Sequence, residues 1–299
     1  MDDLSRRELL GIAGGGLVAG GAGYLLLPDS GDTPRRAYES WVPAAQGRIE
    51  SVRYWDISSL RANRAFLPFE LSETDFEQDL NLFNTEDIEW EITSMADFLQ
   101  GGMYFGSFEA AKIADHMDQE WSWASRRGTY EGYHIVGKDD YRWAIGNDAV
   151  IRENLENTLE TIIDTKQGET TRAVEATTGF ARLVDEIGTG SGIYVESLGQ
   201  SFQDTTPSGL RGGGSNVTVE GRSTSFTIAY LLDHEPSDED VSAVRDEVER
   251  YAVTGVSTSV GDQLVTVSGR FDTADLSFSH LYGEYSLQRE LPLPGGPSR

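Results

Sequence analysis

Hydrophobic and polar residues alternate along several short stretches in the first half of the chain, and each alternation predicts a strand. Successive side chains of a strand point to opposite faces, so a period of two leaves one face for a core. The predicted strands are Ile49–Ile57, Asp87–Ser94, Met103–Phe105, Trp121–Ser125, Glu131–Val136 and Tyr141–Ile145.

Three stretches between residues 107 and 188 show apolar spacings of three and four residues instead, which predicts helices. Ser107 is a suitable N-cap for the first helix, Phe108–Met117. The other two have apolar faces formed by Leu155, Leu159, Ile162 and Ile163, and by Phe180, Leu183, Val184 and Ile187.

The last third of the chain repeats the same order of elements. Val217–Leu232 predicts a long strand, and Ser237 opens a helix in which Asp240 is placed to complete a capping box. Val253–Ser259 and Gln263–Phe271 predict a hairpin.

The order strand–helix–strand–strand therefore occurs twice, near residues 103–145 and 217–271. It predicts an α+β fold of two βαββ-like units, with antiparallel sheets packed on helices. The predicted parts are a signal or membrane anchor (1–27), a tether (28–47), a first α+β domain (48–204), a Gly/Pro/Ser linker (205–216), a second βαββ unit (217–272) and an extended tail (273–299).

The N-terminal segment has a motif of its own. Ser5, Arg6 and Arg7 are followed by Leu9 and Leu10, and this pattern resembles the twin-arginine export signal. Leu9–Leu27 has nineteen residues without a charge, and seven of them are glycines, which is typical of such signals.

The resemblance implies export through the twin-arginine machinery and an extracytoplasmic location. The protein would be anchored in the membrane by this segment or secreted after cleavage; a poor cleavage site favours the anchor. The alternative is a buried N-terminal helix of a cytoplasmic protein, which amphipathic spacing would indicate and an all-apolar stretch does not.

The chain is strongly acidic, with 50 acidic and 24 basic residues and a formal net charge of -26. Such a charge repels nucleic acid and anionic lipid, so neither is an expected ligand. Lysine occurs only at Lys112, Lys138 and Lys166. This composition resembles that of salt-adapted archaeal proteins, and the chain resembles haloarchaeal twin-arginine-signal proteins; the alternative is an acidic protein from an ordinary cell.

No motif with a catalytic mechanism is present. The chain has no cysteine, which excludes disulfides, thiol nucleophiles and Cys–Zn sites. There is no nucleophile elbow, no P-loop and no closely spaced histidine pair, so no cofactor or metal is indicated. Carboxylates are so numerous that their proximity in the sequence cannot single out a catalytic pair.

Aromatic residues gather on the predicted strands between residues 121 and 145. Trp121, Trp123, Tyr133, Tyr141 and Trp143 form either a platform for a sugar, an apolar ligand or a partner protein, or the core beneath the helix Phe108–Met117. Separately, Asn216-Val217-Thr218 is a glycosylation sequon, expected in an exposed loop.

Together these features predict an exported, membrane-tethered surface or envelope protein that serves binding or assembly, with a protein or glycan partner that the sequence does not identify. The absence of a nucleophile motif favours this function over an enzyme. The alternative is an extracytoplasmic hydrolase that uses a carboxylate pair.

Overall fold

The computed structural model describes residues 37–44, 50–68, 85–95, 102–139, 141–153, 158–202, 209–249 and 254–276. By its internal contacts the chain divides into Met1–Pro34 and Arg35–Arg299, and all described residues belong to the second unit. The predicted export residues Ser5, Arg6, Arg7, Leu9 and Leu10 lie outside the described ranges. Within those ranges, no helix is both long and apolar enough to cross a membrane.

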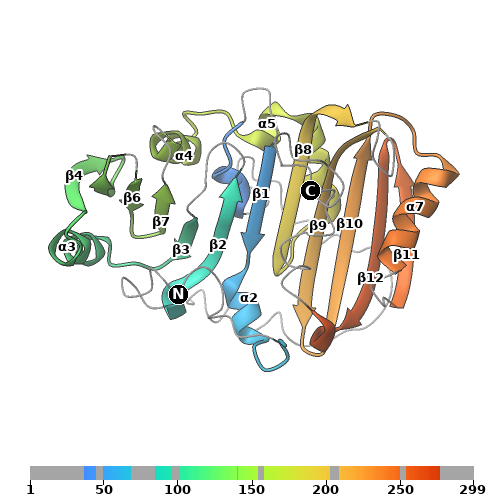
Figure 1. Cartoon of the computed structure of the whole chain (residues 1–299), viewed down its shortest axis with the longest axis horizontal. Coiled ribbons are helices and arrows are strands. Elements are labelled where there is room, and N and C mark those ends of the chain that lie inside the picture. The colour runs from blue at the N-terminus through green and yellow to red at the C-terminus, as the bar shows by residue number, and fades with distance from the viewer. Residues whose placement is uncertain are drawn as a thin grey trace, which may run out of the picture. The chain divides into compact units, whose positions relative to one another are not determined.

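In the described part of the chain, twelve strands form one sheet, in which every neighbouring pair is antiparallel (Figure 1). Their order is β11-β12-β10-β9-β8-β1-β2-β3-β7-β6-β5-β4. The strands are β1 Glu50–Trp55, β2 Ile88–Met95, β3 Met103–Gly106, β4 Ser125–Tyr130, β5 Tyr133–Lys138, β6 Tyr141–Ile145, β7 Ala149–Glu153, β8 Gly192–Phe202, β9 Leu210–Glu220, β10 Ser223–Leu232, β11 Thr254–Gly261 and β12 Leu264–Asp272.

The described helices lie between the strands along the chain. They are α2 Ile57–Ala62, α3 Ala110–Glu120, α4 Thr158–Gln167, α5 Ala173–Ala176, α6 Thr178–Ile187 and α7 Asp238–Glu249, with short 3-10 turns at Ala37–Ser40, Thr85–Asp87 and Thr273–Asp275. The predicted capping box at α7 is confirmed, since the Ser237 hydroxyl accepts from the Asp240 amide (3.2 Å) and the Asp240 carboxylate accepts from the Ser237 amide (2.9 Å).

The prediction of an α+β fold with two βαββ-like units is wrong, because the described strands all share one antiparallel sheet instead of forming two units, and the described helices are few. The local order was correct: β3-α3-β4-β5 and β10-α7-β11-β12 both occur. In each case the helix connects an inner strand (β3 or β10) to an edge strand (β4 or β11) that runs parallel to it. The strands that follow in the chain fill the space between these two and are antiparallel to their neighbours. Local periodicity shows this order but not which strands become neighbours.

Helices cover both faces of the sheet. On one face, α4 packs on β6 and β7 and α6 packs on β8–β10, through Leu159 and Ile162 of α4 and Leu183 and Ile187 of α6. On the other face, α3 packs on β4–β6 and α7 packs on β11 and β12. The alternation along β6 follows this division, since Trp143 and Ile145 face α3 while Ala144 faces α4.

Several predicted boundaries are also corrected. Residues Trp121–Ala124 form a turn where a strand was predicted, and the strand β4 instead runs over Ser125–Tyr130. The predicted strand Val217–Leu232 is two strands joined at Gly221 and Arg222. Part of the predicted tether, including Tyr38 and Trp41, is buried in the core, and Leu210–Asn216 of the predicted linker belongs to β9.

Candidate functional site

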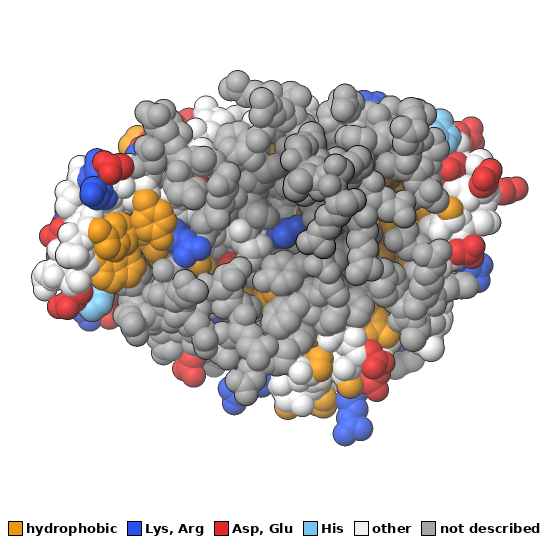
Figure 2. All heavy atoms as spheres, in the orientation of Figure 1, with side chains coloured by type: hydrophobic (Ala, Val, Ile, Leu, Met, Phe, Trp, Pro, Cys, Tyr) orange, Lys and Arg blue, Asp and Glu red, His pale blue; other side chains and the backbone are white. Residues whose placement is uncertain are grey.

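An exposed aromatic patch lies where α3 passes into β4. We define the patch as Trp121, Trp123 and Tyr141. Trp123 is 39% exposed and Tyr141 is 36% exposed, while Trp121 is half-buried. Figure 2 shows hydrophobic side chains gathered on the surface over this end of the sheet.

The three rings of the patch form a row, in which the Trp123 ring contacts both of the others. The ring centroids of Trp121 and Trp123 are 5.2 Å apart with an interplanar angle of 30°, and those of Trp123 and Tyr141 are 5.1 Å apart at 55°. Aromatic pairs in this range stabilise each other by about 0.5–1.5 kcal/mol beyond the area they bury. The rings therefore support one another and form a continuous surface.

Trp143 supports the patch from beneath. It is fully buried, and its ring lies 5.8 Å from that of Trp121 in an edge-to-face arrangement. The Arg152 guanidinium lies 5.9 Å from the Trp143 ring centroid, a cation–π contact that the sequence analysis missed because Arg152 lies on the next strand. The patch is thus anchored in the core beneath α3.

Hydrogen bonds of the backbone hold the turn that carries Trp121 and Trp123. The Trp121 amide donates to the Met117 carbonyl (3.1 Å) at the end of α3, and the Ala124 amide donates to the Trp121 carbonyl (2.9 Å). The Arg126 amide then donates to the Asp118 carboxylate (3.0 Å), and its guanidinium pairs with Asp115 (2.6 Å). The rings are consequently positioned before any ligand arrives.

The structure separates Tyr133 from the other four predicted platform residues. Tyr133 is buried on the opposite face of the sheet, where its hydroxyl donates to Asp148 (3.1 Å). Burial is the main reason why the pKa of Tyr133 is raised above its usual range. The predicted cluster therefore divides into the surface patch (exposed Trp123 and Tyr141 with half-buried Trp121), a buried support (Trp143) and a core residue of the other face (Tyr133).

Asn216 is not in the exposed loop that was predicted. It lies in β9 and is buried, and its side-chain amide donates to the carbonyls of Ile187 (2.8 Å) and Thr189 (2.5 Å). The nitrogen that would carry a glycan is therefore occupied within the fold. The sequon is a structural feature of this strand instead of an accessible acceptor.

Acidic side chains are the remaining candidates for chemistry. Five described ones are buried: Glu39, Glu91, Glu153, Glu196 and Asp240. Asp240 caps α7, and Glu196 accepts a hydrogen bond from the Tyr194 hydroxyl. No group of three or more acidic or histidine side chains in the described ranges is arranged to hold a metal ion. A catalytic carboxylate pair stays a prediction.

No family model and no curated protein matches the sequence. Among solved structures, crystal forms III, IV and I of TP0453 are similar to this chain, with 8%, 9% and 9% identity. They cover 82%, 79% and 83% of this chain and 97%, 93% and 96% of their own, at TM-scores of 0.47, 0.49 and 0.47. At these values the likeness assigns no function to the chain.

Proposed function

We propose that the chain is an extracytoplasmic binding protein, held at the cell surface by its N-terminal segment, and that the aromatic patch binds a neutral glycan. The observation that carries the binding role is the pre-positioned patch of Trp121, Trp123 and Tyr141 on the buried Trp143. Rigid aromatic side chains bind with little loss of conformational entropy, which favours their use as ligand contacts.

The size of the patch favours a small ligand over a partner protein. From the exposed fractions of Trp123 (39%) and Tyr141 (36%), the two side chains offer roughly 150 Å² of accessible surface, taking ~150–250 Å² for a whole aromatic side chain. A stable protein interface takes about 800 Å² from each partner. A sugar ring, which has an apolar face and hydroxyl edges, matches the smaller area and the amphipathic character of Trp and Tyr.

The charge of the chain favours a neutral sugar. With a net charge of -26, the protein repels an anionic polymer over any distance at which charge is not screened. Acidic side chains are also prominent on the surface, as over α7 in Figure 2. Stacking on aromatic rings does not depend on charge and persists in high salt, where screening lengths fall to ~3 Å at 1 M.

Export supports the same proposal. The twin-arginine motif at Arg6 and Arg7 and the uncharged segment that follows would place the sheet domain outside the cytoplasm. Surface glycans are accessible there. The proposal therefore rests on two features: the extracytoplasmic location predicted from the sequence, and the aromatic patch described in the structure.

The test is calorimetric titration of the intact protein with the neutral glycan fraction of the native cell envelope. We expect wild type to bind, and Trp123→Ala or Tyr141→Ala to weaken binding about tenfold or more, which corresponds to ~1.4 kcal/mol. Phe66→Ala is the matched control, because Phe66 is exposed to a similar extent (40%) but lies in the turn after α2.

Three outcomes would contradict the proposal: no binding by wild type, equal binding by Trp123→Ala, or an equal loss in Phe66→Ala. Release of new reducing ends during incubation would instead support the alternative of a hydrolase acting through a carboxylate pair.

A further inference from the structure

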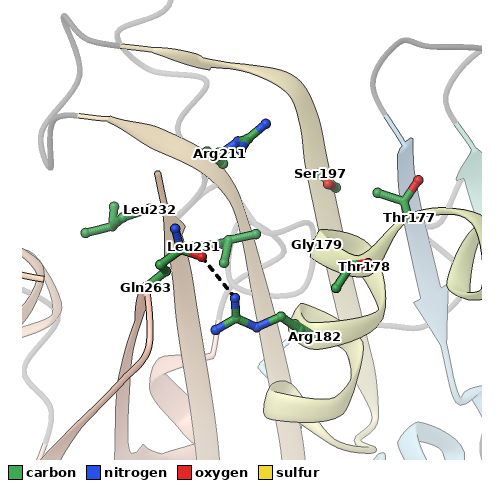
Figure 3. Close-up of a pocket in the computed structure, with 9 residues that line it drawn as sticks. All are labelled: Thr177, Thr178, Gly179, Arg182, Ser197, Arg211, Leu231, Leu232 and Gln263. Atoms are coloured by element: carbon green, nitrogen blue, oxygen red, sulfur yellow. Dashed lines mark hydrogen bonds between the residues drawn. The ribbon is translucent and has the colours of Figure 1, made fainter. Parts of the chain in front are cut away.

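A pocket of about 360 Å³ lies between the first turn of α6 and the ends of β8, β9 and β10 (Figure 3). It is on the half of the sheet that does not carry the aromatic patch. Its lining includes two arginines, Arg182 and Arg211, and none of its nine lining residues is acidic. In a chain with 50 acidic and 24 basic residues, this is a local reversal of charge.

Neither arginine is neutralised by an acidic side chain in the described part of the chain. Arg182 donates to the Gln263 side chain (3.3 Å) and to the Asp262 carbonyl, both of which are uncharged acceptors. The exposed Arg211 side chain forms no hydrogen bond or ion pair with any described residue. Surface arginines in so acidic a protein have many acidic side chains available as partners. Two arginines of one pocket without an acidic partner therefore indicate a place where an anionic ligand can bind.

A β-bulge directs Arg211 to this side of the sheet. Gly212 pairs with Leu231 and Leu210 pairs with Leu232, so Arg211 has no partner on β10. Bulges of this kind re-aim a side chain that regular alternation would place on the other face. The first turn of α6 faces the same pocket with Thr178 and Gly179, and no side chain caps it, so its amides add positive potential.

Ser197 adds a hydrogen-bonding group to the lining of the pocket. Its side chain is only 5% exposed and lines the pocket from β8, yet its hydroxyl has no hydrogen-bond partner among the described residues. The hydroxyl is therefore free to donate to or accept from a molecule in the pocket. Gly179 keeps the hydroxyl accessible, because a Cβ there would lie 3.2 Å from Ser197 Oγ.

The arrangement of the two arginines limits the shape of the ligand. Figure 3 shows the guanidinium groups of Arg182 and Arg211 well apart, with the Leu231 side chain between them. A single small ion cannot use both groups, whereas a molecule with an anionic group at each end and an aliphatic middle can. Each guanidinium can then bind its oxyanion through two parallel hydrogen bonds.

We propose that this pocket binds a short organic dianion of the aliphatic dicarboxylate class. One carboxylate pairs with Arg182 and the other with Arg211, while the aliphatic chain lies against Leu231. The Ser197 hydroxyl and the first turn of α6 supply the additional hydrogen-bond donors. This site is separate from the glycan surface proposed above and does not depend on it.

The test is calorimetric titration of the intact protein with glutarate, at an ionic strength kept constant with KCl. Valerate has the same carbon chain but one carboxylate, and 1,5-pentanediol has none. We expect glutarate to bind at least tenfold more tightly than valerate, and pentanediol and inorganic phosphate not to bind measurably. Arg211→Gln and Ser197→Ala should each weaken glutarate binding about tenfold.

Arg222→Gln is the matched control, because Arg222 is an exposed arginine at the opposite end of β9 and its loss changes the net charge equally. Circular dichroism of each variant confirms that it is folded. The proposal is overturned if wild type does not bind glutarate, if valerate binds as tightly, or if Arg222→Gln loses as much affinity as Arg211→Gln.

Discussion

At the scale of single residues, Asn216 shows how a buried amide is used. The turn at Thr189 and Gly190 folds over it, and a Cβ on Gly190 would lie 1.7 Å from Asn216 Oδ1. The amide nitrogen satisfies two carbonyls that end α6 and begin that turn. The last carbonyls of a helix have no donor within the helix. The Asn216 side chain, on the neighbouring strand, supplies that donor.

His234 is another residue whose neighbours define its chemistry. Its ring lies between two carboxylates, with Nδ1 2.9 Å from Asp233 and Nε2 3.2 Å from Asp240. The hydrogen bond to Asp233, followed by the one to Asp240, raises the pKa of His234 above its ordinary value. Burial alone would raise the pKa of Asp240, but hydrogen bonds from Ser237 and His234 lower it.

The raised pKa of His234 predicts a pH dependence of stability. Because the folded pKa exceeds the unfolded value of ~6.5, the stabilisation is fully present below pH ~6.5 and is lost as pH rises through the folded pKa. Chemical denaturation of wild type and His234→Gln should show that the difference between their free energies of unfolding shrinks as pH rises through this range.

The control for this prediction is His116→Gln, which removes a histidine from the exposed side of α3 where no described residue contacts it through a hydrogen bond or ion pair. An equal pH-dependent difference in both variants would contradict the role of the two carboxylates beside His234. An NMR titration in which the His234 ring titrates at or below ~6.5 would refute the prediction.

At the scale of elements, β9 and α6 explain what the sequence could and could not show. The amphipathic pattern of Phe180, Leu183, Val184 and Ile187 predicted α6 correctly, because a helix on a sheet buries one stripe. The glycines at 212–214 indicated a linker, but in the structure they lie within the sheet. Gly212 and Gly214 face α6, and a Cβ on Gly212 would lie 2.9 Å from Leu183.

For the candidate sites too, local patterns in the sequence do not show which distant segments come together. Trp121, Trp123, Tyr141 and Trp143 lie together, but Trp121 and Trp123 lie in a turn instead of the predicted strand, and Tyr133 lies on the other face of the sheet. Which rings are exposed depends on α3 and on the partner strands, and these contacts are distant in sequence. The pocket was missed altogether, because Arg182, Ser197 and Arg211 meet only through the pairing of β8, β9 and β10.

Gly212 supplies a prediction at this scale. Gly212→Ala places a methyl group 2.6 Å from the Glu196 carbonyl oxygen, so α6 or β8 must shift. We expect a loss of about 1–3 kcal/mol in the free energy of unfolding, as for other overpacked cores. Urea denaturation measures the change.

Gly261→Ala is the matched control, because nothing lies within 4 Å of its Cβ position at the end of β11. Its stability should stay within about 0.5 kcal/mol of wild type, as for other surface substitutions. Equal losses in the two variants would show that close packing of α6 on β9 is not the cause.

At the scale of the whole molecule, the long sheet has two edges that must not pair with other chains. β4 and β11 are these edges, and their side chains are largely exposed. Each pairing contains an irregularity, between Arg126 and Gly128 in β4 and between Thr254 and Ser257 in β11. Bulges and charges at edge strands oppose edge-to-edge aggregation, as does the net charge of -26.

Location is the property on which the proposed binding function depends. Twin-arginine substrates cross the membrane folded, and a single continuous sheet with helices on both faces would have to form before export. An aromatic patch that binds surface glycans has its ligand only on the outer side of the membrane.

The most direct test is fractionation of the native cell, comparing wild type with the double variant Arg6→Lys and Arg7→Lys. We predict that wild type is found in the membrane or the medium and that the variant is retained in the cytoplasm. Wild type in the cytoplasm would contradict both the export of the chain and its proposed function at the cell surface.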